Sequence, residues 1–307
     1  MGHGPSNTMG FRPQPVRNNQ GDAPFGATMI GYDMRLKTFA TSLWAAAGLA
    51  MAGSSVVAQQ VTQELEIVGT PVNGGTGFQP AATDIARDVQ WLDHWLLIMC
   101  TVITLFVSAL LAWVIIRYNQ KRQPVPATFT HNSPLEIAWT IVPVIILVFI
   151  GAFSLPVLFK QQEIPEADIT IKVTGYQWFW GYEYVDEGVQ FESYMLAREE
   201  LEEFGYSQAE YLLATDTAVV VPIGATIVMQ VTGADVIHSW TIPAFGVKQD
   251  AVPGRLAELW FAADREGIYF GQCSELCGKD HAYMPITVKV VSQETYDAWL
   301  AEAKGTS

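Results

Sequence analysis

Two long apolar segments constrain the fold of this chain more than any other feature. Residues 95–116 and 137–159 are runs of 22 and 23 residues without a formal charge. At 1.5 Å per residue, each would form a helix of roughly 33–35 Å, long enough to cross a hydrocarbon core of about 30 Å. The sequence therefore predicts a transmembrane helical hairpin over 95–159, with helices at about 92–117 and 135–159.

The charges around this hairpin predict its orientation. The loop between the two helices carries Arg117, Lys121 and Arg122, whereas residues 59–94 carry one arginine and five carboxylates. Loops on the cytoplasmic side of a membrane are enriched in Lys and Arg. We therefore expect a cytoplasmic loop, with both ends of the mature chain and the second half of the protein outside.

The segment before the hairpin divides into three parts. Residues 1–33 are polar and rich in Gly, Pro and Asn, which predicts a disordered or untranslated extension. Residues 34–58 run from basic through apolar to small residues, the order of a secretory signal peptide cleaved after Ala58. An uncleaved membrane anchor is the alternative, although the apolar run is short for one. Residues 59–94 then form an extracytoplasmic N-terminal segment.

From residue 160 the pattern changes to that of β-strands. Turn residues separate short alternating segments, which favours an all-β sandwich over 160–292; the clearest segments are 169–174, 225–231, 257–261 and 286–291. Residues 197–211 interrupt them with an acidic, helix-prone stretch. A C-terminal helix and tail are expected over 293–307, with Ser292 as N-cap and Glu294 in the first turn.

Acidic residues concentrate in the second half of the chain. Residues 160–307 contain 23 acidic and 9 basic residues, whereas residues 1–159 contain 8 of each, and the net charge is −14. Such a domain disfavours nucleic acid, because phosphate binding requires Lys and Arg. It favours a cationic protein partner instead. Only 16% of residues are charged, against about 25% in soluble domains, which argues against an ordinary cytosolic enzyme.

The strongest chemical signal is a cluster of soft metal ligands. Four of them fall within 12 residues, and His238 lies 35 residues before the first: Cys273, Cys277, His281 and Met284. Thiolate and thioether ligands together select copper, and one Cys with two His and a weak Met is the mononuclear blue-copper set. The second cysteine permits two bridging thiolates, which can hold two copper ions with one histidine on each.

Three simpler interpretations of this cluster remain. The spacing of the four residues would also place them on one helix face, although Gly278 and Pro285 argue against a helix there. The two cysteines could form a disulfide in an oxidising compartment. Zinc could bind the cysteines and histidines, but zinc would not account for Met284.

With these motifs in view, the chain resembles subunit II of the haem–copper cytochrome c oxidases of bacteria and mitochondria. The resemblance covers about residues 59–300. It rests on the hairpin, on Gln177-Trp-Phe-Trp-Gly-Tyr-Glu-Tyr184, on Asp235-Val-Ile-His-Ser-Trp240, on residues 247–255 and on the loop from Cys273 to Met284. It implies a cupredoxin-like sandwich on a two-helix membrane hairpin, in a bacterial inner membrane, with the copper domain and both mature termini on the periplasmic side.

The resemblance also implies a set of ligands. The side chains of five residues would bind a dinuclear copper A centre: His238, Cys273, Cys277, His281 and Met284. Glu275 would give its backbone carbonyl to the copper and its carboxylate to a Mg²⁺ shared with subunit I. The chain would take electrons from cytochrome c and pass them to haem in subunit I, where oxygen is reduced and protons are pumped, with subunit III as a further partner. It would act as a redox relay without an oxygen-reducing site.

Two single residues have both a structural and a functional interpretation. Aromatic residues alternate over 176–184, so an unbroken strand would place them on one face, where most would be core. The resemblance selects Trp178 among them as the point where the electron enters. Glu136, at the start of the second helix, could simply stabilise the helix dipole. The resemblance links it to proton uptake at the mouth of a channel in subunit I.

Scattered carboxylates provide the candidate docking surface. Asp235, Glu183 and Glu192 lie on or near segments expected around the copper loop. A solvated acidic face is the simpler interpretation, and docking of a basic cytochrome c is the functional one. Two alternative functions remain: subunit II of a quinol oxidase, which would not need the copper ligands, and a periplasmic copper carrier, which would not need the second thiolate.

Overall fold

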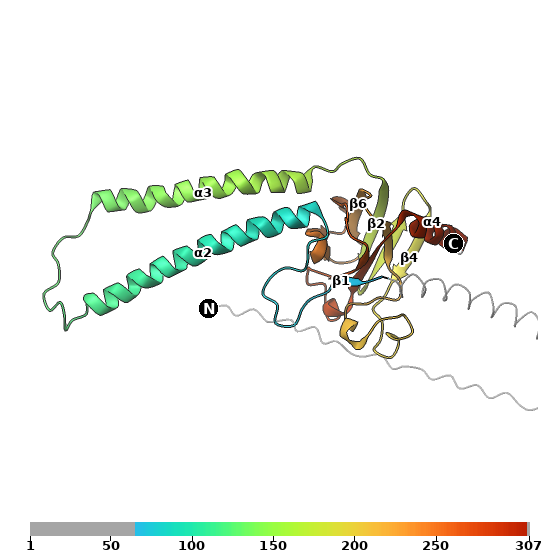
Figure 1. The fold of residues 1–307 in the computed structure, drawn as a ribbon, viewed down its shortest axis with the longest axis horizontal. Coiled ribbons are helices and arrows are strands. Elements are labelled where there is room, and N and C mark those ends of the chain that lie inside the picture. Colours follow the sequence, from blue (N-terminus) through green and yellow to red (C-terminus); the bar gives the residue numbers. More distant parts are fainter. Residues whose placement is uncertain (1–64, 306–307) are drawn as a thin grey trace, which may run out of the picture. The chain divides into compact units, whose positions relative to one another are not determined.

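The computed structural model describes residues 65–305, in which two long helices precede a β-sandwich (Figure 1). The extension and signal peptide expected over residues 1–58 lie outside the described residues. The sandwich and the two apolar helices confirm the fold class expected from the sequence.

Both long helices have the length and composition of membrane spans. Helix α2 comprises Asp84–Arg117 and helix α3 comprises Ser133–Gln162, with mean hydropathies of 2.5 and 2.7 over their most apolar windows. None of the residues in those windows is buried inside the protein. A helix that is apolar and uncovered over this length requires lipid or partner helices around it.

Helix α2 begins at Asp84, earlier than the start at about 92 expected from the apolar run. Its first turn is fixed by Thr83, whose hydroxyl accepts a hydrogen bond from the backbone N–H of Ala86 (3.0 Å) and donates one to the carbonyl of Phe245 (2.8 Å). Ile85 and Ala86 are buried. The apolar run is therefore shorter than the helix. The first two turns of α2 are polar on one side and contact the β domain on the other.

Helix α3 has a reciprocal cap at its start. The side chain of Asn132 accepts a hydrogen bond from Leu135 N (3.2 Å), and the carboxylate of Glu136 accepts one from Asn132 N (3.1 Å). Such caps satisfy N–H groups that a helix leaves unpaired at its first turn. Pro143 and Pro156 lie inside the helix, as transmembrane helices tolerate.

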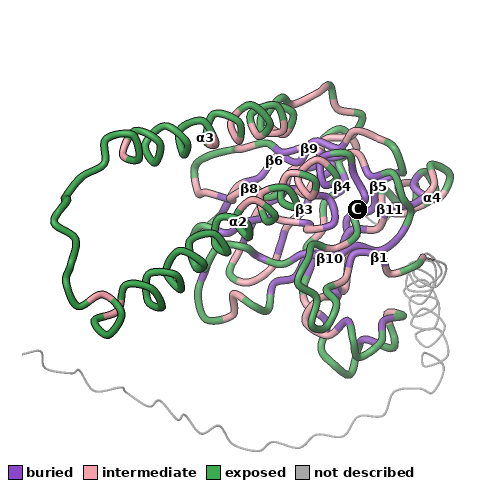
Figure 2. Tube along the Cα trace, turned by 60° about the vertical axis from the view of Figure 1, so that its left-hand side comes forward, coloured by how far each residue is buried: buried purple, intermediate pink, exposed green. Residues whose placement is uncertain are grey.

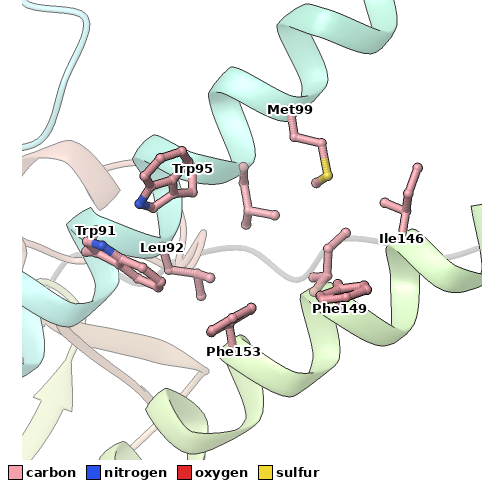
Figure 3. A pocket seen from close by; sticks show the side chains of 9 residues that line it. Trp91, Leu92, Trp95, Met99, Ile146, Phe149 and Phe153 are labelled. Carbon is pink, nitrogen blue, oxygen red and sulfur yellow. The ribbon is translucent and has the colours of Figure 1, made fainter.

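An apolar groove of about 440 Å³ lies between α2 and α3 (Figure 3). Aromatic rings form much of its wall, with Trp91 in edge contact with both Trp95 and Phe153. Met99, Ile146 and other apolar side chains complete the lining. Its lining contains none of the residues for which the sequence predicts chemistry.

The β domain consists of two main sheets and a short ladder. One sheet has the order β1-β10-β11-β5, with β1 Ile67–Gly69, β10 Gly267–Gln272, β11 Pro285–Val291 and β5 Val219–Pro222. The other has the order β4-β3-β2-β6-β9, with β4 Val189–Ser193, β3 Phe179–Tyr184, β2 Ile169–Tyr176, β6 Ile227–Gly233 and β9 Ala257–Phe261. The ladder pairs β7 His238–Ile242 with β8 Val247–Ala251.

The core lies between the sheets (Figure 2); burial alternates along β2 and β3, whereas β5, β10 and β11 are buried almost throughout. Trp180, Tyr182 and Tyr184 of β3 point inward and are almost completely buried. The expected strand over 176–184 is broken at Gln177-Trp178, so Tyr176 does not share their face. Tyr176 instead stacks on Phe179 on the outer face, with ring centroids 4.7 Å apart.

Strand β1 adds an edge that the sequence analysis missed. It pairs in parallel with β10, with Ile67 opposite Ile268. A second tie follows, since Ala82 N donates to the carbonyl of Ala244 (2.9 Å) and Asp264 N donates to that of Ala82 (3.0 Å). The segment before the first membrane helix is therefore part of the β domain.

Residues 197–211 form turns and one short 3₁₀ helix, η1 (Gln208–Glu210), where an acidic helix-prone stretch was expected. They build a small second core in which Leu201 and Tyr206 pack against Phe270. Helix α4 (Gln293–Gly305) ends the described chain, with the hydroxyl of Ser292 accepting from Thr295 N (3.2 Å) as its cap.

Candidate metal centre

Two glycines allow the elements of the centre to approach each other closely. A Cβ on Gly271, at the end of β10, would lie 1.8 Å from the carbonyl oxygen of Thr241 on β7. A Cβ on Gly175, at the end of β2, would lie 2.8 Å from the imidazole ring of His238. Because neither residue has a side chain, the first residue of β7 and the residue following β10 come side by side. These residues are His238 and Cys273.

The loop between β10 and β11 supplies the remaining ligands. Gln272 and Pro285 are paired across the two strands, so the chain leaves and returns at the same place. Residues of the loop form turns and the 3₁₀ helix η3 (His281–Tyr283), which excludes the α-helical interpretation of the ligand spacing. The indole N–H of Trp180 donates to the backbone carbonyl of Met284 (3.3 Å) and ties the end of the loop to the core.

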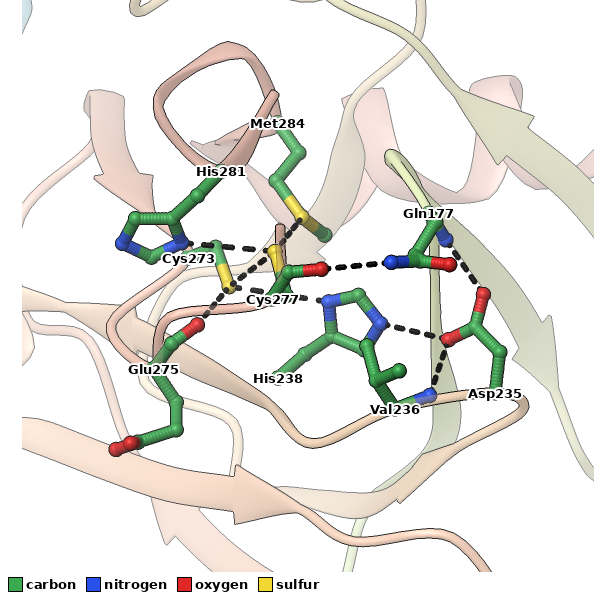
Figure 4. A network of polar contacts seen from close by, with 9 residues as sticks. All are labelled: Gln177, Asp235, Val236, His238, Cys273, Glu275, Cys277, His281 and Met284. Atoms are coloured by element: carbon green, nitrogen blue, oxygen red, sulfur yellow. Dashed lines mark hydrogen bonds and ion pairs between the residues drawn. The ribbon is translucent and has the colours of Figure 1, made fainter. Parts of the chain in front are cut away.

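The donor atoms of the loop and of His238 converge (Figure 4). The two cysteine sulfurs are 3.9 Å apart and unbonded. Cys273 Sγ lies 3.9 Å from His238 Nδ1 and 3.3 Å from the carbonyl oxygen of Glu275. Cys277 Sγ lies 3.5 Å from both His281 Nδ1 and Met284 Sδ. Each histidine thus stands beside a different cysteine; His238, both cysteines and Met284 are buried, and His281 is half-buried.

The two thiols differ in their affinity for protons. Burial raises the pKa of Cys273, but hydrogen bonding to His238 and to backbone groups outweighs burial and lowers it to about 7. Burial and the neighbouring Cys273 sulfur raise the pKa of Cys277 to about 12. Without a cation the pair therefore retains a proton at neutral pH. A bound metal would displace it, because thiolates and not thiols are the ligands.

The carboxylate of Asp235 contacts the candidate metal centre as well as solvent. One carboxylate oxygen accepts hydrogen bonds from His238 Nε2 (2.9 Å) and Val236 N (2.6 Å), and the other accepts one from Gln177 N (2.8 Å). Burial raises the pKa of Asp235, but these hydrogen bonds hold it below its usual value. With Nε2 donating to the carboxylate, Nδ1 of His238 is free to face the sulfurs, the arrangement by which outer carboxylates orient metal-binding imidazoles.

Trp178 lies in the turn between β2 and β3, half-buried against the loop between β10 and β11 that carries the candidate ligands. Its ring fits over Gly278, where a Cβ would lie 3.0 Å from the ring atom Cζ2. The ammonium of Lys279 stands 5.4 Å from the ring centroid, a cation–π contact. The indole nitrogen of Trp178 is buried and has no hydrogen-bond partner among the described residues.

The other two candidate docking carboxylates lie on the outer face of the sheet that contains β3. Glu183 pairs with Lys172 of β2 at 3.4 Å, and Glu192 of β4 accepts a hydrogen bond from the hydroxyl of Tyr194. Both line a shallow pocket of about 320 Å³ above Gly181. They are thus separate from Asp235, which bonds to the centre itself.

Glu275 and Glu136 occupy different surroundings. The carbonyl of Glu275 points into the cluster, whereas its carboxylate points away from the sulfurs (Figure 4). Glu136 lies at the start of α3 as a half-buried capping residue. The structure therefore brings together the five predicted side-chain ligands, the Glu275 carbonyl, Asp235 and the Trp178 turn, and leaves Glu136, Glu183 and Glu192 elsewhere.

Gln177 has no role predicted from the sequence, although its side-chain amide donates to the carbonyl of Cys277 at 2.7 Å. Its position directly before Trp178 was the available signal, but a polar residue in a turn is too common to single out. Gly175 and Gly271 were likewise invisible in sequence, because their role depends on which strands approach them.

Comparisons with known proteins agree with this architecture. Residues 169–291 match the family model for the periplasmic domain of cytochrome c oxidase subunit II, and residues 71–157 match the model for its transmembrane domain. The chain is 64% identical to cytochrome c oxidase subunit 2 of Cereibacter sphaeroides over 274 residues, which cover 85% of this chain and 89% of the relative. It is 46% identical to the probable cytochrome c oxidase subunit 2 of Rickettsia felis over 231 residues, 75% of this chain and 72% of the relative.

A solved structure resembles the β domain. It is the periplasmic domain of subunit II of cytochrome oxidase from Bradyrhizobium japonicum, 49% identical, covering 47% of this chain and 98% of that chain with a TM-score of 0.43.

Proposed function

Because the chain belongs to the cytochrome c oxidase subunit II family and is a subunit of a haem–copper oxidase, we propose that it is the electron-accepting subunit of that complex. The convergence of five side-chain donors and one carbonyl is the observation that supports this proposal. The high identity to cytochrome c oxidase subunits disfavours a quinol oxidase or a copper carrier.

The donor set fits a dinuclear copper A centre. His238, Cys273, Cys277, His281 and Met284 would hold it through their side chains, and Glu275 through its carbonyl. When bound, such a centre would supply a one-electron redox couple. Two thiolates and a thioether favour copper over harder ions, and the burial of His238, both cysteines and Met284 limits the access of water to the couple.

Residues of this chain then fix where electrons enter. Trp178 presents a half-buried ring between the surface and the ligand loop, so an electron from cytochrome c would pass through it. Asp235 holds the His238 imidazole with Nδ1 toward the sulfurs. Glu183 and Glu192 add negative charge to a face that a cationic cytochrome c would approach. Electrons would leave toward haem in subunit I.

We further propose roles for two carboxylates and for the ends of the chain. The Glu275 carboxylate, directed away from the sulfurs, would bind Mg²⁺ at the boundary with subunit I. Glu136 would collect protons at the cytoplasmic edge while it caps α3. Residues 34–58 would be a cleaved signal peptide, which places the copper domain in the periplasm. Subunit III would be a further partner.

The sidedness has support beyond the charge pattern. Strand β1 precedes the first membrane helix and β10 follows the second, yet the two are paired. Both ends of the hairpin therefore face the same aqueous compartment. Since the connecting loop is basic, that compartment would be the periplasm.

Electron paramagnetic resonance of the purified oxidase tests the copper assignment. The wild-type complex should show one unpaired electron coupled equally to two copper nuclei. Cys277→Ser removes one of the two thiolates, so the signal should become mononuclear or disappear and the copper content of the complex should fall.

The chain offers a matched control in Cys100, a free cysteine exposed on α2. Cys100→Ser should leave both the signal and the copper content unchanged. A wild-type spectrum with coupling to a single nucleus would contradict the dinuclear centre, and zinc in place of copper would contradict the metal assignment.

A further inference from the structure

The turn that carries Trp178 is bound to both halves of the metal centre through the residue before it. The backbone N–H of Gln177 donates to Asp235, whose other oxygen accepts from His238. The side-chain amide of Gln177 donates to the carbonyl of Cys277 at 2.7 Å. One residue thus links the turn before β7, which carries Asp235, to the loop of one cysteine ligand (Figure 4).

Trp178 itself lacks a comparable tether. Its indole nitrogen is buried without a hydrogen-bond partner among the described residues, so packing and the cation–π contact with Lys279 hold the ring. That packing depends on a close approach, because a Cβ on Gly278 would lie 3.1 Å from Gln177 Nε2 and 3.0 Å from Trp178 Cζ2. The glutamine amide and the indole ring therefore share one small contact area on the ligand loop.

From these contacts we infer that Gln177 is a positioning residue, which holds Trp178 against the Cys277–Gly278 segment so that electron transfer to the centre is fast. This inference rests on the proposed function, since it presumes that electrons pass through Trp178. In this role Gln177 differs from the residues that attract cytochrome c, because Gln177 acts only after docking.

The expected consequence concerns rate rather than affinity. A neutral amide exerts no long-range field, so Gln177 contributes little to steering a cationic partner. Loss of one hydrogen bond lets the turn populate other arrangements. The productive population, and with it the transfer rate, should fall by about two- to tenfold.

Two variants of Gln177 in the assembled oxidase test whether this residue positions Trp178. Gln177→Met keeps the length of the side chain and removes the donor. Gln177→Glu also removes the donor, and adds a negative charge that should tighten the binding of cytochrome c. Rapid mixing of each oxidase with saturating reduced cytochrome c gives the first-order rate of copper reduction within the complex. A titration with cytochrome c gives the affinity.

In both variants the first-order rate should fall by the stated factor, while copper content, the copper spectrum and reduction by a small uncharged donor stay as in wild type. For Gln177→Glu the rate should fall although the affinity rises, a divergence that a defect in docking would not produce. The matched control is Gln230→Met, which removes a glutamine on β6 whose amide donates to Glu258 at 3.1 Å.

Two results would overturn the inference. A wild-type rate in Gln177→Met would mean that Trp178 is positioned without the side-chain hydrogen bond of Gln177. Loss of copper or an altered spectrum in both variants would make Gln177 part of the structure of the metal centre itself. A wild-type complex whose copper accepts no electrons from cytochrome c would instead contradict the proposed function, independently of any variant.

Discussion

At the scale of single residues, the same side chain often serves the fold and the proposed chemistry together. Asp235 satisfies Val236 N and Gln177 N while it orients His238. Neutralising Asp235 would therefore disturb docking, the turn and the imidazole at once. For this reason Asp235 is a poor probe of docking, and isosteric changes at residues with a single hydrogen bond are more informative.

Glu136 is such a residue, because the one hydrogen bond described for its side chain is the one that it accepts from Asn132 N. Glu136→Gln retains an oxygen for that cap and removes the titratable proton. If Glu136 collects protons, the variant should slow turnover of the assembled oxidase several-fold, while copper content and the KM for cytochrome c stay unchanged. Turnover measured across pH checks this, and wild-type turnover throughout would leave Glu136 with the capping role alone.

At the scale of elements, the centre depends on how closely strands approach. His238 begins β7 and Cys273 directly follows β10, and these two strands touch where Gly271 meets the carbonyl of Thr241. Their separation is a property of this contact rather than of the ligand loop. A substitution that moves the strands apart should thus damage the centre without touching a ligand.

Gly271→Ala tests this expectation. The added Cβ would lie 1.8 Å from Thr241 O, so β7 and β10 must separate. Backbone movement of this kind costs about 1–3 kcal/mol, and copper content should fall with it. Gly151→Ala on α3, where a Cβ meets nothing within 4 Å, is the control and should keep its copper. Full copper in Gly271→Ala would show that the strands adapt without loss.

Much of the fold and of the candidate site could be predicted from the sequence, and the features that could not be predicted have physical causes. The hairpin, the sandwich strands and the ligand loop follow from local patterns of apolarity and ligand type. Strand β1 is only three residues long and shows no alternation, so it exists because β10 provides a partner. The break at Gln177-Trp178 was hidden because the aromatic alternation continues through it. The roles of Gly175 and Gly271 depend on neighbours that sequence order does not reveal.

At the scale of the whole molecule, charge and apolar surface are divided between two environments. The helices expose apolar side chains and the β domain carries the acidic excess. Glu183 and Glu192 lie on the outer face of one sheet, away from the ligands. This separation allows the approach of a partner and the transfer of an electron to be measured independently.

Neutralising Glu183 and Glu192 together to glutamine should raise the KM for cytochrome c about two- to tenfold at low salt and leave kcat unchanged. The reason is that surface charges act on encounter and are screened over about 8–10 Å at physiological ionic strength. The difference from wild type should shrink as salt is added. Glu294→Gln, in the first turn of α4, is the control. A KM that responds equally in the control would mean that only net charge matters.

The pairing of β1 with β10 also sets a timetable for the nascent chain. Ile67 emerges from the ribosome about 200 residues before its partner Ile268. At about 5–20 residues per second, the first strand waits about 10–40 s while two helices are inserted and the rest of the sandwich is made. During that interval its partner edge does not yet exist, and the segment stays accessible to chaperones and proteases. The pairing of β1 with β10 is therefore a late step in the folding of the β domain. It requires that both helices have first crossed the membrane in the correct direction.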